Sequence, residues 1–151
     1  MYSQTVSFFN LLLALTILLA AAACTMSSVD DGALVEQNVS DDPWYVEYIH
    51  ERPVIDRSPA YFLFGENGRL SGNASCNQFT GKYEASRGRV TLSDFVTTRR
   101  FCIGSLEEQE RRFLGAVSDV VEWKIEQGLL LMLDARGRTV FQSAKHVQVR
   151  K

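Results

Sequence analysis

Two cysteine-containing stretches constrain the fold of this chain more than any other feature. The first, from Gly72 to Tyr83, places two glycines, one cysteine and two aromatic residues within a dozen positions, and Cys102 follows about two dozen residues after Cys76. In an exported domain an even pair of cysteines usually forms a disulfide, whereas in a cytosolic domain the same pair is more often reduced. We interpret the pair as the staple of a small β-rich domain.

The third cysteine, Cys24, ends an uncharged leader. Residues 11–23 are apolar except for Thr16. As a helix this run spans only ~20 Å, short of the ~30 Å hydrocarbon core of a bilayer, so it is typical of a signal peptide. The small residues before Cys24 resemble the lipobox of bacterial lipoproteins, in which the cysteine carries the lipid and begins the mature chain. The alternatives are an ordinary cleaved signal with an incidental cysteine and, less favoured by so short a run, a retained membrane anchor.

The sequence between Cys24 and the folded domain is rich in Ser, Asp and Gln and has no hydrophobic period. Such a segment cannot bury enough surface to offset its ordering entropy. We therefore expect a signal peptide at 1–23, a flexible tether at 24–42, a domain at 43–143 and a tail at 144–151. Thr25 after the cysteine resembles the outer-membrane sorting pattern of enteric lipoproteins, which implies an envelope protein facing the periplasm.

Short β-branched and aromatic segments separated by turn residues predict antiparallel strands. Asn67-Gly68 is the strongest turn signal, because both residues tolerate the positive φ of a type I′ hairpin, and Gln127-Gly128 predicts another turn. The strands are expected at 44–49, 61–64, 69–74, 83–84, 89–95, 121–125, 129–133 and 139–142.

Two of these strands carry expectations about burial. In the first, the alternation predicts that Trp44, Val46 and Tyr48 share one face. The strand at 129–133 is continuously apolar, which is typical of a strand buried on both faces.

The period changes to helical after Gly104. Ser105 and Glu108 form a capping box, with Ser105 as the N-cap. Glu110 falls on the apolar stripe, where it either reaches solvent at the edge or is a half-buried anchor that pairs with an arginine. One amphipathic helix and many strands predict an α+β, mostly β fold: a curved antiparallel sheet or partial barrel packed by the helix. The stripe consists of Leu106, Phe113, Leu114, Val117, Val120 and Val121.

The ionisable residues point away from several functions. The net formal charge is −2 with both signs mixed, so we expect no nucleic-acid partner. His50 and His146, the two histidines, lie far apart in sequence, and no motif ties either to Cys76 as a nucleophile. There is no Cys-x-x-Cys pair, metal-ligand cluster or phosphate-binding loop. We therefore predict no catalytic residue, no metal and no cofactor.

From Trp44 to about Phe141 the chain resembles the META/HslJ family of small bacterial envelope domains. The most specific match is the Cys-Asn-x-Phe-x-Gly-x-Tyr string at 76–83, which contains Asn77, Phe79, Gly81 and Tyr83. The sequence departs from the family pattern at Ser75, where the family prefers glycine, so we expect ordinary backbone angles there. It departs again at 100–101, where Arg-Phe replaces Met-Ala. The other matching residues are Trp44, Gly72, Thr98, Cys102, Glu110 and Phe113.

This resemblance implies a non-enzymatic envelope protein linked to stress, including heat and antibiotic tolerance. We expect it to act by binding another envelope component and to meet the membrane through a lipid anchor on Cys24. The fold also resembles the pilotins, lipid-binding lipoprotein chaperones of secretion systems, which makes a lipid- or peptide-carrying chaperone the second hypothesis. A groove lined by aromatic residues would favour the carrier, and a barrel filled by them would oppose it. These residues are Phe62, Phe64, Phe79, Phe95 and Phe113.

The roles of Asn77 and of the adjacent arginines Arg99 and Arg100 have more than one interpretation. Asn77 is expected to hydrogen-bond within its own turn rather than to a ligand. Arg99 and Arg100 form either a solvated pair or a contact for lipid A phosphates or for a partner carboxylate.

Overall fold

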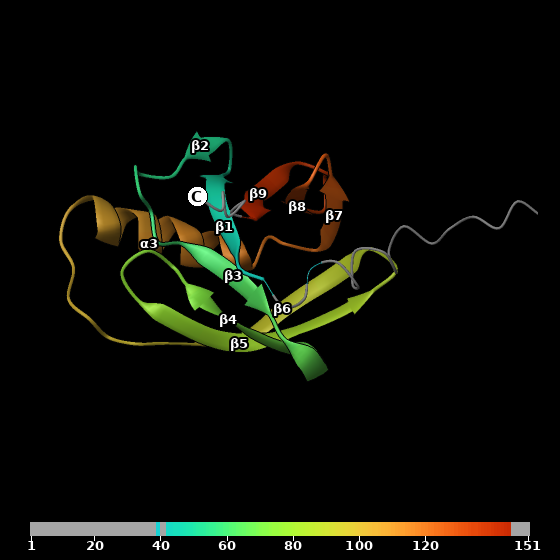
Figure 1. Ribbon diagram of the computed structural model, residues 1–151, viewed down its shortest axis with the longest axis horizontal. Coiled ribbons are helices and arrows are strands. Elements are labelled where there is room, and N and C mark those ends of the chain that lie inside the picture. Colours follow the sequence, from blue (N-terminus) through green and yellow to red (C-terminus); the bar gives the residue numbers. More distant parts are fainter. Residues whose placement is uncertain (1–38, 40–41, 146–151) are drawn as a thin grey trace, which may run out of the picture.

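A computed structural model describes residue 39 and residues 42–145 (Figure 1). The predicted signal peptide, Cys24, most of the predicted tether, and the tail from His146 onward lie outside the described residues.

Nine strands and one α-helix with described bounds make up this part of the chain. The helix, α3, spans Ser105–Val117, and a short 3-10 turn, η2, spans Glu66–Gly68. The strands are β1 (Trp44–Ile49), β2 (Arg52–Pro53), β3 (Tyr61–Phe64), β4 (Arg69–Asn73), β5 (Gln78–Ser86), β6 (Arg89–Thr97), β7 (Glu122–Glu126), β8 (Leu129–Leu133) and β9 (Thr139–Lys145).

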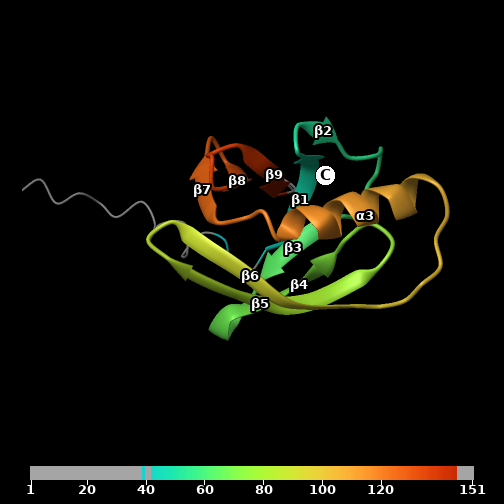
Figure 2. The same cartoon turned by 180° about the vertical axis from the view of Figure 1, so that it is seen from behind.

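All strands pair antiparallel in one sheet, in the order β2-β1-β3-β4-β5-β6-β7-β8-β9. Strand β1 also pairs with β9, so the sheet curves into a ring. The weakest join in this ring is between β6 and β7, where Arg89 opposite Glu122 is the single pair assigned within residues 42–145. Helix α3 connects these two strands in sequence and packs along the curved sheet (Figures 1 and 2). The predicted fold class, a curved antiparallel sheet with one helix, is confirmed.

Aromatic rings fill the interior of the curved sheet. Phe62 is fully buried, and its ring centroid lies 4.8 Å from that of Phe113 on α3 and 5.1 Å from that of Phe141 on β9. The ring centroid of Phe64 lies 5.2 Å from that of Trp123 and 5.2 Å from that of Tyr83. Because rings from β3, β5, β7, β9 and α3 meet in one cluster, the core joins segments that are distant in sequence.

The predicted hairpin turns are confirmed by their backbone angles. Asn67 and Gly68 have φ values of 56° and 72°, and Gln127 and Gly128 have values of 51° and 81°. Positive φ at both central residues is the requirement of a type I′ turn, whose twist matches that of the flanking strands.

The expectation for the inward face of β1 is wrong at Tyr48. Trp44 and Val46 are buried, but Tyr48 is 40% exposed and Ile49 is buried instead. The register of β1 against β9 shifts between Val46 and Tyr48. A bulge at this point reverses which side chains face the core.

The capping box is also absent. Gly104, with a φ of 67°, is the N-cap of α3, and no side chain caps the helix. Ser105 is therefore already inside the first turn, and Glu108 pairs with Arg111 rather than with the cap.

Strand β8 is not buried equally on both faces. Leu130 and Met132 are fully buried against the core, whereas Leu129 and Leu131 are half-buried. The continuous apolar run reflects a partly covered outer face rather than a second core.

The described residues extend the packed region at both ends. Val39, expected in the tether, is fully buried, and its carbonyl accepts a hydrogen bond from Trp44 Nε1 at 3.1 Å. At the other end, β9 continues to Lys145, which pairs opposite Trp44. Residues on either side of the expected boundaries thus contribute to the fold.

Candidate functional site

Asn77 is the centre of a hydrogen-bond network that joins three separate segments. The side chain is 6% exposed, and its Oδ1 accepts hydrogen bonds from Thr98 Oγ1 at 2.7 Å and from the Arg100 backbone N–H at 2.6 Å. Its Nδ2 donates to the Arg100 carbonyl at 3.2 Å and to Glu110 Oε1 at 3.0 Å. Both ends of the amide are therefore satisfied, as a buried polar group requires.

Glu110 is the second member of this network. Its carboxylate is half-buried on α3, and Oε2 accepts the backbone N–H of Asn77 at 2.9 Å. The hypothesis of a half-buried anchor is correct in place but wrong in partner, because the group that pairs with Glu110 is Asn77 and not an arginine. Hydrogen bonds to a charged acceptor are stronger than those between neutral groups, so this contact joins α3 firmly to the start of β5.

A disulfide lies beside the network. Cys76 and Cys102 are bonded, with their Cα atoms 6.1 Å apart and 26 positions apart in sequence. Cys76 directly precedes Asn77, so the same short segment holds the chain after β6 through a covalent bond and through hydrogen bonds. We call Asn77, Thr98, Glu110 and the disulfide the clamp.

The clamp fixes alternate residues of the connection between β6 and α3. The side chain of Thr98 and the backbone N–H of Arg100 are held by hydrogen bonds to Asn77. Cys102 is held by the disulfide. Two apolar residues beside these anchor points are strongly exposed: Phe101, before Cys102, is 90% exposed, and Ile103, after it, is 73% exposed. Arg99 and Arg100 are exposed as well. We call residues 99–103 the tip.

A hollow of about 340 Å³ lies between the tip and α3. Its walls combine the disulfide with apolar and charged side chains, but both cysteines are consumed as a disulfide and the Glu110 carboxylate is occupied by Asn77. This leaves no thiol and no free Glu110 oxygen for a nucleophile–base pair in the hollow. The lining residues are Cys76, Asn77, Arg100, Phe101, Cys102, Glu107, Glu110, Arg111 and Leu114.

The remaining motif residues belong to the core rather than to a site. Phe79 is buried, and Tyr83 is half-buried and donates to the Gly65 carbonyl at 3.1 Å. Gly72 is required because a Cβ there would overlap the backbone carbonyl oxygen of Tyr61 and lie 2.7 Å from the Phe79 ring. A Cβ on Gly81 would lie 2.8 Å from the Ser93 carbonyl oxygen. Trp44 and Phe113 are buried as well.

The expectation that Asn77 bonds within its own turn is wrong. Its side-chain partners lie 21 to 33 positions away in sequence. The local role belongs to Asn73, whose Oδ1 accepts the Ser75 backbone N–H at 2.8 Å.

Ser75 adopts a backbone conformation that favours glycine. Its φ is 122°, it is 3% exposed, and its hydroxyl has no hydrogen-bond partner. The expectation of ordinary angles at this position is therefore wrong. The chain keeps the backbone path of a glycine although a side chain is present, which places strain directly before the clamp.

The aromatic groove that would favour a carrier is not found in the described part of the chain. Phe62, Phe64, Phe79 and Phe113 are between 0% and 2% exposed and pack against one another. Phe95 packs against Phe79 with the ring centroids 5.2 Å apart. The rings thus fill the interior of the sheet.

Sequence reasoning missed Gln109, which is fully buried on α3. Its Oε1 accepts the Ile55 backbone N–H at 2.7 Å and its Nε2 donates to Ser58 Oγ at 2.6 Å. The signal was its spacing, because a residue four positions before Phe113 lies on the same helical face.

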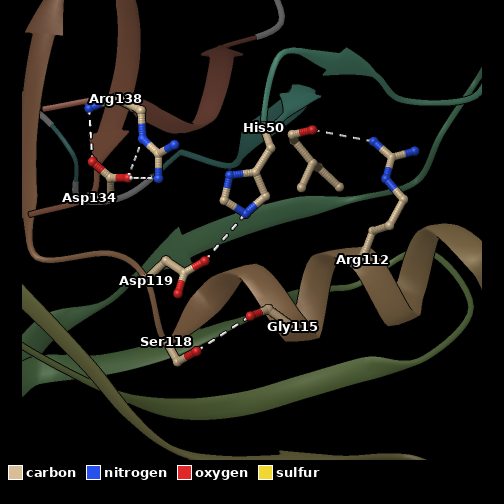
Figure 3. Close-up of polar contacts among 8 residues, drawn as sticks. His50, Arg112, Gly115, Ser118, Asp119, Asp134 and Arg138 are labelled. Carbon is tan, nitrogen blue, oxygen red and sulfur yellow. Dashed lines mark hydrogen bonds and ion pairs between the residues drawn. The ribbon is translucent and has the colours of Figure 1, made fainter. Parts of the chain in front are cut away.

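Polar contacts also hold α3 against the β1–β2 hairpin (Figure 3). Arg112 donates to the carbonyls of Ile49 at 3.4 Å and of Arg52 at 3.2 Å, and His50 Nε2 lies 3.4 Å from Asp119 Oδ2. The side chains of His50 and Asp119 are about half exposed, at 48% and 52%, so this pair adds little stability. We interpret these contacts as structural.

Figure 3 also shows the turn between β8 and β9. Asp134 accepts the backbone N–H groups of Arg136 and Arg138, each at 2.9 Å, and the Arg138 guanidinium lies 2.7 Å from Oδ2. These hydrogen bonds, of which that from the Arg138 backbone has the largest effect, lower the pKa of the Asp134 carboxyl.

Residues 39 and 42–145 contain no group of three His, Cys, Asp or Glu side chains arranged to hold a metal ion. Among the same residues, no helix has the length and apolar character needed to cross a bilayer.

Comparison with known families identifies the domain. The profile of the META domain matches residues 37–146. This chain belongs to the META domain family. The match begins before Trp44 and ends after Lys145, in agreement with the packing of Val39 and the length of β9.

Solved structures share the fold of this META domain. An NMR structure of a protein from Burkholderia xenovorans has a TM-score of 0.62 at 16% identity and covers 76% of this chain and 88% of its own. The crystal structure of a DUF4847 family protein from Bacteroides vulgatus ATCC 8482 has a TM-score of 0.58 at 16% identity, covering 76% of this chain and 99% of its own. At these identities the likeness concerns the fold alone. None of the curated proteins matches the chain.

Proposed function

We propose that this META domain protein is a non-enzymatic binding protein of the cell envelope, anchored by a lipid on Cys24, and that it binds another envelope component through the tip. One observation carries the proposal: the clamp holds residues 98, 100 and 102, while Phe101, between the last two, and Ile103, directly after Cys102, remain 90% and 73% exposed. Large apolar side chains exposed together on one short loop are typical of an interaction site. A preorganised loop also loses less entropy on binding.

The process that we assign to this binding is stress or antibiotic tolerance. Support comes from the resemblance of the motif at 76–83 to the META/HslJ envelope domains. The filled interior of the sheet favours a surface contact over the carriage of a lipid or peptide inside the domain.

Genetic complementation tests this proposal. We expect the wild-type gene to restore heat or antibiotic tolerance to a deletion strain, and the double variant Phe101→Ser, Ile103→Ser to fail although it folds and accumulates normally. The matched control is Val96→Ser, which removes an apolar side chain that is 67% exposed at the end of β6. Full complementation by the double variant would refute binding through the tip.

The anchor needs a separate measurement, the intact mass of the mature protein extracted from membranes. We expect a chain that begins at Cys24 and carries a diacylglycerol. A chain without Cys24, or with a bare cysteine, would contradict lipid anchoring without affecting binding through the tip.

A further inference from the structure

We propose that the tip is a membrane-contact element: Phe101 and Ile103 insert into the headgroup region of a bilayer while Arg99 and Arg100 bind the phosphate groups of anionic lipids. The inference rests on the proposed function, because it identifies the envelope component that the tip binds.

The position of the tip suits contact with a flat surface. The connection between β6 and α3 forms one end of the molecule along its long axis in both views (Figures 1 and 2). An end that carries two strongly exposed apolar side chains can enter a fluid surface without a matching cavity in the partner. Side chains of this kind, next to basic residues, are typical of interfacial membrane contacts.

The size of the apolar contact favours a bilayer over a protein partner. Two such side chains present on the order of 300 Å² of surface. A stable protein–protein interface buries about 800 Å² on each partner. The tip is therefore small for an independent protein interface, but it suits a secondary contact in a protein that a lipid already holds at the membrane, because stable membrane association takes two weak signals.

The charges of the tip complement an anionic surface. Within the described residues, neither Arg99 nor Arg100 has a carboxylate within ion-pair distance. The nearby acidic side chains are largely engaged elsewhere, since Glu108 pairs with Arg111 and Glu110 accepts hydrogen bonds from Asn77. Glu107 is exposed in the first turn of α3 and is the carboxylate that opposes this attraction.

The clamp explains how the tip is held in the required shape. The Arg100 backbone N–H and carbonyl both bond to Asn77, and Cys102 is bonded to Cys76. The conformation that projects Phe101 and Ile103 thus exists before any partner is met. Insertion then requires no refolding of the connection, which lowers the cost of binding.

Depth-dependent fluorescence quenching tests the proposal on the full chain. The variant Phe101→Trp is reconstituted into vesicles of phosphatidylethanolamine and phosphatidylglycerol, with and without brominated acyl chains that quench tryptophan. The native Trp44 and Trp123 are 2% and 1% exposed and give a constant background. The matched control is Val96→Trp, at a site that is exposed but outside the tip.

We expect brominated lipid to quench the added tryptophan at position 101 and to leave the one at position 96 unchanged. Replacing Arg99 and Arg100 by glutamine should weaken insertion about fivefold for each arginine, as a basic residue at an anionic surface contributes. The same charge change at Arg87, in the β5–β6 turn, and at Arg89, the first residue of β6, should have no effect on insertion. Salt should weaken insertion, because the Debye length falls from ~8 Å at physiological ionic strength to ~3 Å at 1 M.

A tryptophan at position 101 that stays unquenched and emits like a solvent-exposed indole would overturn the inference. A photo-crosslinking residue at this position that gives a protein adduct in cells would also overturn it, since the tip would then dock on a protein. If quenching fails while the Phe101→Ser, Ile103→Ser variant still loses tolerance, the proposed function stands and only insertion of the tip into a bilayer is refuted. If that variant retains tolerance as well, both fail.

Discussion

Replacing Ser75 by glycine should stabilise the protein. At a φ of 122° a residue with a Cβ is strained, and such strain costs on the order of 1–3 kcal/mol. The buried hydroxyl has no partner, which costs a further ~1–3 kcal/mol. Glycine increases the entropy of the unfolded chain, which offsets about 0.5–1 kcal/mol of this gain. We expect a net stabilisation of about 3 kcal/mol.

Urea denaturation measures this change directly, as a higher midpoint at an unchanged m value. The control Ser75→Ala removes the hydroxyl but keeps the Cβ, so it should recover only the contribution of the unsatisfied polar group. The difference between the two variants isolates the backbone strain. If alanine stabilises as much as glycine, or if glycine destabilises, the strain at Ser75 does not exist and the account of this segment is wrong.

Three further predictions concern the clamp and the β8–β9 turn. Replacing Cys76 and Cys102 together by serine should lower the free energy of unfolding by roughly 3–4 kcal/mol, because the disulfide closes a loop across 26 positions. A reductant should destabilise the wild type but not the variant. Equal stability of the two proteins would show that the disulfide is not formed. Glu110→Ala should lower the free energy of unfolding by about 2 kcal/mol, because it leaves Asn77 N–H groups unpaired, and it should speed proteolysis at residues 98–104. The control Glu107→Ala, at an exposed position, should change the free energy of unfolding by no more than about 0.5 kcal/mol. Equal effects of the two substitutions would refute the clamp. Because the pKa of Asp134 is lowered in the folded protein, its carboxylate stabilises the fold above the unfolded pKa of about 3.9, and this stabilisation is lost as the pH falls through the lower folded pKa. The difference in stability between the wild type and Asp134→Asn should therefore be present at neutral pH and vanish in acid. A difference that persists in acid would contradict the assignment.

The parts of the fold that the sequence predicts correctly are those set by local chemistry. Asn67-Gly68 and Gln127-Gly128 specify their hairpins because positive φ is accessible to those residues whatever surrounds them. The helix is found for the same reason, since the apolar period repeats within a few turns. In each case the information lies within the element itself.

The errors arise where a distant segment decides the outcome. Tyr48 is exposed because β1 pairs with both β3 and β9 and shifts register against β9, which the alternation in β1 cannot reveal. Gly104 is the N-cap of α3 in place of Ser105, in a connection that the disulfide at Cys102 ties to Cys76.

The clamp is the least predictable feature of the structure. Asn77, Thr98 and Glu110 all match the family pattern, but their spacing gives no indication that they meet. Asn77 is joined to the other two by contacts across 21 and 33 positions. Composition and period describe single elements, whereas this network exists only after β5, β6 and α3 have been brought together.

The clamp also explains why the tip can differ from the family pattern without loss of fold. Asn77 holds residue 100 through its backbone N–H and carbonyl, so the side chain at this position is free of the clamp. The next side chain, Phe101, projects into solvent. The replacement of Met-Ala by Arg-Phe at these two positions therefore changes the exposed chemistry of the tip while the atoms that hold it stay the same. We therefore expect substitutions at residues 100 and 101 to change the exposed surface of the tip with little effect on the clamp, and expect the preference of the proposed binding to be determined at these positions.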